Sequence, residues 1–200
     1  MKRWQRGYTA VELMLALGLF AVGVSGIIAM QKVTIVSNQH AKNLAIATRI
    51  AEAWMDQLAA DSTLWNATTG ISSTLWVQGA SGTTNGVWHV PAWDTNRDFG
   101  PAFDALGAPV QNAANARFFT HVRLTTLYAE EGGLINGRTV LADNGLARAE
   151  VRVVWLRDGA TPIPDAFTND ADVIQAVADA TDIYHRVVKV GAVRQHGSPK

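Results

Sequence analysis

The residues Gly7-Tyr8-Thr9-Ala10-Val11-Glu12-Leu13 set a lone acid between a basic leader and a long apolar run, and this pattern predicts the structure of the N-terminal part of the chain. The leader, residues 1–7, holds three cations and no acid. From Leu13 to Gln31 the chain has 19 residues without a charge. As a helix, a run of that length reaches about 28 Å, close to the hydrocarbon thickness of a bilayer. The sequence therefore predicts a transmembrane helix at about residues 13–31.

The charges on either side of this run predict its orientation. Three cations precede it and Lys32 follows it, so the positive-inside rule places the N-terminus in the cytoplasm and exports everything after Lys32. A secretory signal peptide, cleaved near Val24-Ser25-Gly26, is the competing interpretation. Glu12 argues against it, because a carboxylate is costly at the edge of lipid and needs a partner.

These residues resemble the processing site of type IV prepilins and type II secretion pseudopilins. The resemblance implies that a membrane prepilin peptidase cuts between Gly7 and Tyr8 and methylates the new N-terminus on Tyr8, and that Glu12 acts in subunit assembly. Phenylalanine is more usual than tyrosine at the first mature position, and Ala29 stands where many major pilins have a helix-kinking proline. Residues 17–31 look more like PilV-type minor pilins and the minor pseudopilin I group.

The implied cleavage gives Glu12 a partner of opposite charge. The new α-amino group of Tyr8 would lie four positions before Glu12 on one helix. Opposite charges about 4 Å apart gain roughly 4 kcal/mol at an effective dielectric near 20. The pair can form within one subunit or between neighbours, and the family's assembly model takes the intermolecular choice.

The helical pattern continues beyond the span. No proline precedes Pro91, and residues 39–60 are rich in helix formers, so we predict one stem helix over residues 8–60. Its second half is expected to pack one apolar face on a head domain. The residues of that face are Leu44, Ile46, Ile50, Ala53, Trp54 and Leu58. Glycines in the first half are expected either to let the stem bend during assembly or to allow close helix packing: Gly18, Gly23 and Gly26.

Residues 61–200 are predicted to form an exported head with an antiparallel β-sheet, so the fold class is α+β: a long N-terminal helix packed on a small sheet. Residues 61–115 read as loops with short strands. Three longer strands are expected at Arg117–Tyr128, Ala149–Leu156 and Ile183–Val193. Their predicted core residues are Phe118, Val122, Leu124, Val151, Val153 and Trp155. An acidic, exposed insertion is expected at Asp158–Asp182.

Composition excludes several classes of function. The chain has 200 residues, with 17 basic and 17 acidic side chains, so no basic field draws it to nucleic acid. It has no cysteine, which excludes disulfides and thiolate metal sites. Five scattered histidines are expected at the surface or at sheet edges: His40, His89, His121, His185 and His196. With no nucleophile motif or phosphate loop either, we expect a protein that is not an enzyme and that holds no cofactor.

Two features of the head are compatible with ligand binding. Asp94, Asn96 and Asp98 have the spacing of the start of a calcium loop, but Phe99 occupies the glycine position, so a surface turn is the alternative. Four tryptophans in the loop-rich region either fill a core or stack on sugars: Trp65, Trp76, Trp88 and Trp93.

Two functions follow from these patterns. The first is a structural subunit, a minor pilin or pseudopilin, held in the bacterial inner membrane with its head in the periplasm and then built into a filament. Its expected partners are the prepilin peptidase, other pilins or pseudopilins through the N-terminal helix, the inner-membrane assembly platform and membrane lipid. The second is a signal-anchored periplasmic binding module, with glycans as its candidate ligand, whose processing motif is coincidental.

Overall fold

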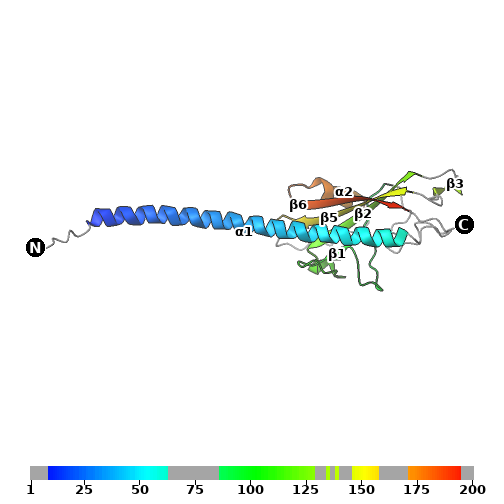
Figure 1. Cartoon of the computed structure of the whole chain (residues 1–200), viewed down its shortest axis with the longest axis horizontal. Helices are drawn as coiled ribbons and strands as arrows, with labels where there is room; N and C mark the ends of the chain where they lie inside the picture. The colour runs from blue at the N-terminus through cyan, green and yellow to red at the C-terminus, as the bar shows by residue number, and fades with distance from the viewer. Residues whose placement is uncertain are drawn as a thin grey trace, which may run out of the picture. The chain divides into compact units, whose positions relative to one another are not determined.

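The residues that the structure describes form a long helix, a four-stranded antiparallel sheet, a separate pair of short strands and a short second helix (Figure 1). The structure is a computed structural model that describes residues 9–62, 86–128, 134–135, 138–139, 146–157 and 171–194. Its elements are α1 (Ala10–Asp61), β1 (Ala102–Phe103), η4 (Ala113–Asn115), β2 (Phe118–Tyr128), β3 (Leu134–Ile135), β4 (Arg138–Thr139), β5 (Leu146–Leu156), α2 (Ala171–Asp179) and β6 (Tyr184–Arg194). The chain divides into two compact units, residues 1–43 and 44–200.

The α+β arrangement predicted from the sequence is confirmed. Helix α1 runs without interruption from Ala10 to Asp61 and passes through its three glycines as one helix. The main sheet has the strand order β1-β2-β5-β6, with each strand antiparallel to its neighbour. The register of β5 against β6 holds without a shift from Leu146↔Arg194 to Leu156↔Tyr184. Strands β3 and β4 form a separate hairpin pair.

The main hydrophobic core lies between the last part of α1 and one face of this sheet, which we call the front face. Trp54 and Leu58 of α1 are fully buried, and the Trp54 ring lies 4.8 Å from that of Phe99. All six core residues predicted on the strands are buried in this same cluster. One helix prediction is wrong, because Leu44 keeps 43% of its surface exposed. Burial on α1 begins only at Ala47, so Leu44 precedes the packed turns.

The opposite face of the sheet, the back face, holds a second core. Phe119 of β2 and Val154 of β5 are buried there together with Ile174 and Val177 of α2. The prediction that residues 158–182 form an exposed acidic insertion holds for Asp172, Asp179 and Asp182, which are exposed. It is wrong for Ile174 and Val177 of α2, which lie at i and i+3 and pack on the sheet. Residues 158–170 of that insertion lie outside the described residues.

Candidate functional site

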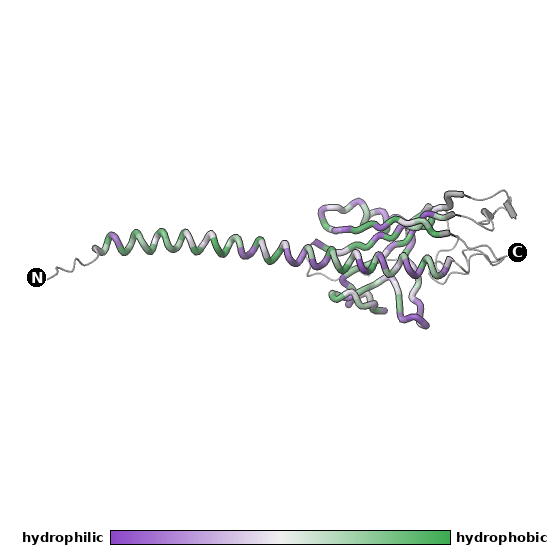
Figure 2. The backbone as a smooth tube through the Cα atoms, in the orientation of Figure 1, coloured by the Kyte–Doolittle hydropathy of each residue, from purple (hydrophilic) through white to green (hydrophobic). Residues whose placement is uncertain are grey.

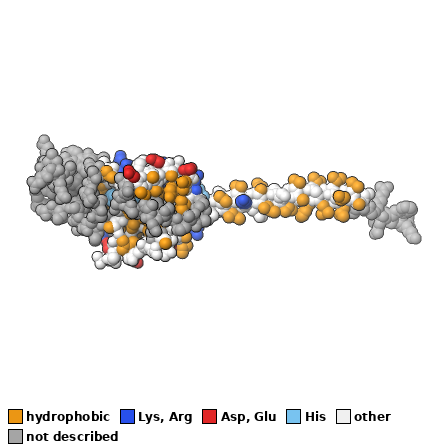
Figure 3. Space-filling model, turned by 180° about the vertical axis from the view of Figure 1, so that it is seen from behind, with side chains coloured by type: hydrophobic (Ala, Val, Ile, Leu, Met, Phe, Trp, Pro, Cys, Tyr) orange, Lys and Arg blue, Asp and Glu red, His pale blue; other side chains and the backbone are white. Residues whose placement is uncertain are grey.

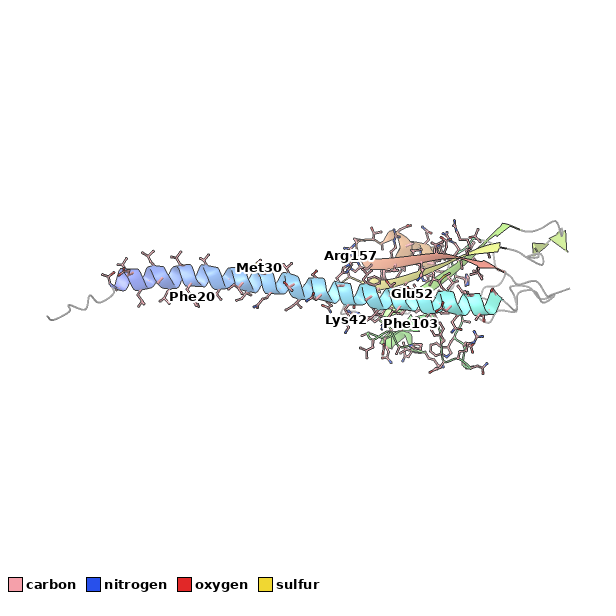
Figure 4. The ribbon with its side chains drawn as sticks, in the orientation of Figure 1. Phe20, Met30, Lys42, Glu52, Phe103 and Arg157 are labelled. Carbon is pink, nitrogen blue, oxygen red and sulfur yellow. The ribbon has the colours of Figure 1, made fainter. Side chains whose placement is uncertain are left out.

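The first part of α1 presents apolar side chains that none of the described residues covers. Figure 2 shows mostly hydrophobic residues along it, and Figure 3 shows their side chains over the visible face. Phe20 and Met30, which project from the helix in Figure 4, are 68% and 74% exposed. The most apolar stretch of α1 has no buried residue. This helix is long and apolar enough to cross a membrane, which is also true of a signal sequence.

Glu12 lies in the first turn of α1 and completes a capping box with Thr9. The Glu12 backbone N–H donates to Thr9 Oγ1 at 3.3 Å, and the Thr9 N–H donates to Glu12 Oε2 at 3.4 Å. The two residues thus satisfy donors that the helix leaves open at its N-terminus. The charge argument from the sequence missed this role of Glu12, although the spacing Thr-x-x-Glu indicates it. Gly7 and Tyr8, the predicted cleavage and methylation site, lie outside the described residues.

A shallow apolar depression follows the capping box on the same helix. Its lining is Val11, Met14, Leu15, Gly18, Leu19 and Val22. A Cβ added at Gly18 would meet no atom within 4 Å, and the same holds at Gly23 and Gly26. No contact made by the described residues therefore requires glycine at these three positions.

The residues with calcium-loop spacing form a tight turn. The buried carboxylate of Asp94 accepts the N–H groups of Asn96 at 2.8 Å and Arg97 at 3.4 Å through Oδ1. Arg97 Nε lies 3.7 Å from Asp94 Oδ2, and Arg97 Nη1 donates to Asp61 at 3.0 Å. Asp98 closes the turn with a φ of 49°. The carboxylate of Asp94 is thus engaged by its own turn and by a guanidinium, as in an Asx turn.

No metal centre is evident among the residues that the structure describes, where no three His, Asp or Glu side chains are grouped to hold an ion. Two of the four clustered tryptophans are described, and both are half-buried. The guanidinium carbons of Arg123 and Arg152 each lie 4.5 Å from the centre of the Trp88 ring. A Cβ added at Gly100 would overlap the ring of Trp93. Trp65 and Trp76 lie outside the described residues.

A buried polar cluster occupies the back face beside Trp88. The prediction that all histidines lie at the surface or at sheet edges is wrong for His89 and His121, which are 7% and 0% exposed. Arg152, itself 4% exposed, places Nη2 2.9 Å from Nδ1 of His121 and donates to the carbonyl of Ile174 at 3.3 Å. These side chains are buried because α2 and the segment around Trp88 cover the back face, as the last part of α1 covers the front face.

Burial sets the charge states in this cluster. Desolvation, helped by the positive charge of Arg152, lowers the pKa of His121 to about 3. Desolvation also lowers the pKa of His89. Arg152 keeps its charge although burial, with the nearby charges of Arg186 and Arg123, lowers its pKa to about 10. His121 is therefore neutral at pH 7 and accepts from Arg152 through Nδ1.

The described residues offer exposed surfaces on which another molecule can bind. No cluster of them is arranged as a catalytic site for breaking bonds. His121 and Arg152 are sealed within the head, and Glu12 lies exposed at the start of the helix. Comparison of the chain with models of protein families, with curated proteins and with solved structures found no match.

Proposed function

We propose that this protein is a minor pilin or pseudopilin, a structural subunit that takes part in assembling or priming a type IV pilus or a type II secretion pseudopilus. The observation that carries the proposal is the motif around Gly7 and Glu12 directly before a helix that exposes apolar side chains all along its first part. The last part of the same helix is built into the core of the head. A subunit with these parts is held by lipid before assembly and by other helices afterwards.

In this proposal the leader stays in the cytoplasm and the head reaches the periplasm. A prepilin peptidase removes residues 1–7 and methylates Tyr8. The inner-membrane assembly platform then transfers the subunit from lipid into the filament, where the apolar side chains of α1 pack on those of neighbouring subunits. Burial in either surrounding removes these side chains from water, which contributes about 25 cal/mol per Å².

In this proposal Glu12 pairs with a cationic N-terminus, and its free hydrogen-bonding capacity supports that pairing. Its Oε2 makes two long contacts with Thr9, at 3.4 Å and 3.5 Å, while its Oε1 has no hydrogen-bond partner among the described residues. A carboxylate has capacity for about four hydrogen bonds, so the cap leaves room for the methylated amine of Tyr8 from the same or a neighbouring subunit. Pairing in a water-poor filament would remove the cost of two isolated charges.

Mass spectrometry of the chain isolated from membranes tests the proposal. We expect a mature protein that begins at Tyr8 and carries one methyl group on its α-nitrogen. The matched variant Gly7→Ala should remain uncut, because the peptidase acts after glycine in the family that the motif resembles. A chain that begins at Met1, or after Gly26, would contradict the proposal and favour a signal anchor or a signal peptide.

A further inference from the structure

Helix α2 is attached to the back face of the sheet in two ways (Figure 1). Its apolar residues Ile174 and Val177 are buried in the back-face core. Two guanidinium groups of the sheet also donate to carbonyls of α2 that lie one turn apart. Arg152 Nη2 donates to Ile174 O at 3.3 Å, and Arg186 Nη1 donates to Ala178 O at 2.8 Å. A small apolar contact and two cations therefore hold this helix in place.

The back-face core is separate from the core on the front face. Among the described residues, the front-face cluster contains side chains of α1, β2, β5 and β6 and none from α2. Helix α2 can therefore leave the sheet without removing any side chain from the front-face core. Such a local opening costs less free energy than unfolding the whole head, because the apolar area buried on the front face stays buried.

Arg152 connects α2 to His121 of β2. Its Nε and Nη2 lie 3.3 Å and 2.9 Å from Nδ1 of His121, and both side chains are buried. A guanidinium has only donors, so Nδ1 must be the acceptor. A proton on Nδ1 would remove the acceptor and place two positive charges side by side beneath α2.

The charged groups around His121 do not offset a second positive charge. Glu150 is the buried acid among the described residues of β2, β5, β6 and α2, and Arg123 and Arg148 already bind it at 2.6 Å and 3.0 Å. Asp179 of α2 favours the charge of Arg152 but is itself exposed to water. The other charged or titratable groups of the elements packed here include Asp172, Tyr184, Arg186 and His89.

We propose that Arg152 and His121 form an acid-sensitive latch for α2. The helix stays on the back face while His121 is neutral, and a proton on His121 favours a state in which α2 has left the sheet and the rest of the head remains folded. In that open state water solvates both cations, which removes the cost of holding them together in the core. The inference does not depend on the filament role proposed above.

The opening equilibrium should depend steeply on pH. In the open state His121 titrates near its ordinary pKa of 6.5, whereas in the closed state burial lowers its pKa to about 3. Between these values the open state binds a proton that the closed state does not. Closure is therefore strongest above pH 6.5 and weakens as the pH falls toward 3. From pH 7 to pH 5 the population of the open state should rise about 25-fold.

Two single-cysteine variants of the full chain in neutral detergent micelles test this inference. The chain contains no cysteine, so each variant carries one reporter thiol. Val153 and Val154 are neighbours on β5, 0% and 1% exposed, in the front-face and the back-face core respectively. Val154 lies opposite Arg186 and two positions from Arg152, the two residues that bond to α2. Val154→Cys thus reports the opening of α2, and Val153→Cys is its matched control.

An aromatic disulfide that reacts with thiols at acidic pH, such as dithiodipyridine, measures the opening. Each labelling rate is divided by the rate of the same variant in urea at the same pH. We expect the thiol of Val154→Cys to be labelled at least about tenfold faster than that of Val153→Cys at pH 7 and at pH 5, since global unfolding alone exposes the latter. The normalised rate of Val154→Cys should rise about 25-fold from pH 7 to pH 5.

A second substitution in the Val154→Cys chain identifies the titrating group. His121→Gln supplies an oxygen that can accept from Arg152 and does not titrate, so it should remove most of the rise in labelling between pH 7 and pH 5. His89→Gln is the matched control and should leave most of that rise in place. A rise that persists in His121→Gln would assign the titration to another group and overturn the latch.

Two further outcomes would overturn the inference without any substitution of His121. Equal labelling rates for Val153→Cys and Val154→Cys would show that acid unfolds the head as a whole and that α2 does not open by itself. A normalised rate of Val154→Cys that is the same at pH 7 and pH 5 would show that protonation does not drive the opening.

Discussion

Arg152 Nη2 lies 2.9 Å from His121 Nδ1, so a buried guanidinium of β5 uses a neutral imidazole of β2 as its acceptor. A guanidinium always donates, and the pair forms only while His121 remains unprotonated. No ion pair of Arg152 with a carboxylate occurs within the part of the chain that the structure describes. Protonation of His121 would set two cations side by side in the core.

We expect acid to destabilise the head well above the pH at which its carboxylates titrate. Burial lowers the pKa of His121 from 6.5 to about 3 in the folded chain, so below pH 6.5 the unfolded chain binds a proton that the folded chain does not. Stability is therefore full above pH 6.5 and declines as the pH falls toward 3. From pH 7 to pH 5 the free energy of unfolding should fall by about 2 kcal/mol, measured by urea unfolding in detergent with near-ultraviolet circular dichroism.

The matched variant is His121→Gln, whose side-chain oxygen can accept from Arg152 and does not titrate. Its stability should change much less than that of the parent between pH 7 and pH 5. The lowered pKa of His89 contributes a residual slope of the same sign. Parallel pH dependence in the parent and in His121→Gln would show that His121 is not the group responsible.

A second prediction concerns Gly107, which has a φ of +84° and lies against α1. A Cβ at this position would come within 2.9 Å of Ile46 Cγ2. Gly107→Ala should therefore lower the free energy of unfolding by about 2–4 kcal/mol, through left-handed strain and overpacking together. Gly86→Ala is the control, because Gly86 has a similar φ of +81° but its added Cβ would lie 3.7 Å from Thr125 Oγ1. Equal losses in the two variants would show that contact with Ile46 does not matter.

A third prediction separates the helix cap that Glu12 forms with Thr9 from the charge pairing proposed for it. Glu12→Gln keeps an oxygen that can accept the Thr9 N–H but removes the charge, whereas Glu12→Ala removes both. We expect both variants to be cut after Gly7 and both to be poorly incorporated into filaments, as measured by immunoblotting of sheared filaments against the membrane fraction. Normal incorporation of Glu12→Gln would show that the cap, and not the charge pair, is what assembly requires.

A fourth prediction concerns Gly18 and Gly23, beside which the isolated chain leaves open space. Replacing either with alanine should leave membrane insertion and helicity in detergent unchanged or slightly raised, because alanine favours a helix by up to about 1 kcal/mol. Incorporation into filaments should fall if helices approach closely there. Unimpaired incorporation of both variants would mean that assembly does not need glycine at these positions.

The main elements could be predicted from the sequence because the apolar residues of each recur with one clear period, that of a helix or that of a strand. The stem helix was expected at residues 8–60 and is described from Ala10 to Asp61, and the expected strand Ile183–Val193 is found at Tyr184–Arg194. The strand expected from Ala149 begins at Leu146, since alanine and arginine at its start pair with β6 without any β-branched signal.

The back face of the sheet could not be predicted in the same way. Alternation of polar and apolar residues indicates a strand with one face exposed to water. In this sheet both faces are covered, so polar residues such as His121 and Arg152 are buried. Helix α2 was not predicted, because the acidic character of the aspartates around it hid the apolar pattern of Ile174 and Val177. The calcium spacing at Asp94 was ambiguous because Asx turns use the same short side chains.

Trp54 and Leu58 are buried, so the last part of α1 covers one side of the head's hydrophobic core. A secreted fragment that starts after Asp61 would expose the front of the sheet to water and would aggregate or remain unfolded. The boundary at which the head can be separated from the exposed apolar part of α1 therefore falls inside the helix, at the junction of residues 43 and 44. A gene fusion should therefore keep residues 44–61 with the head, and a protease that releases an intact head should cut near residue 43.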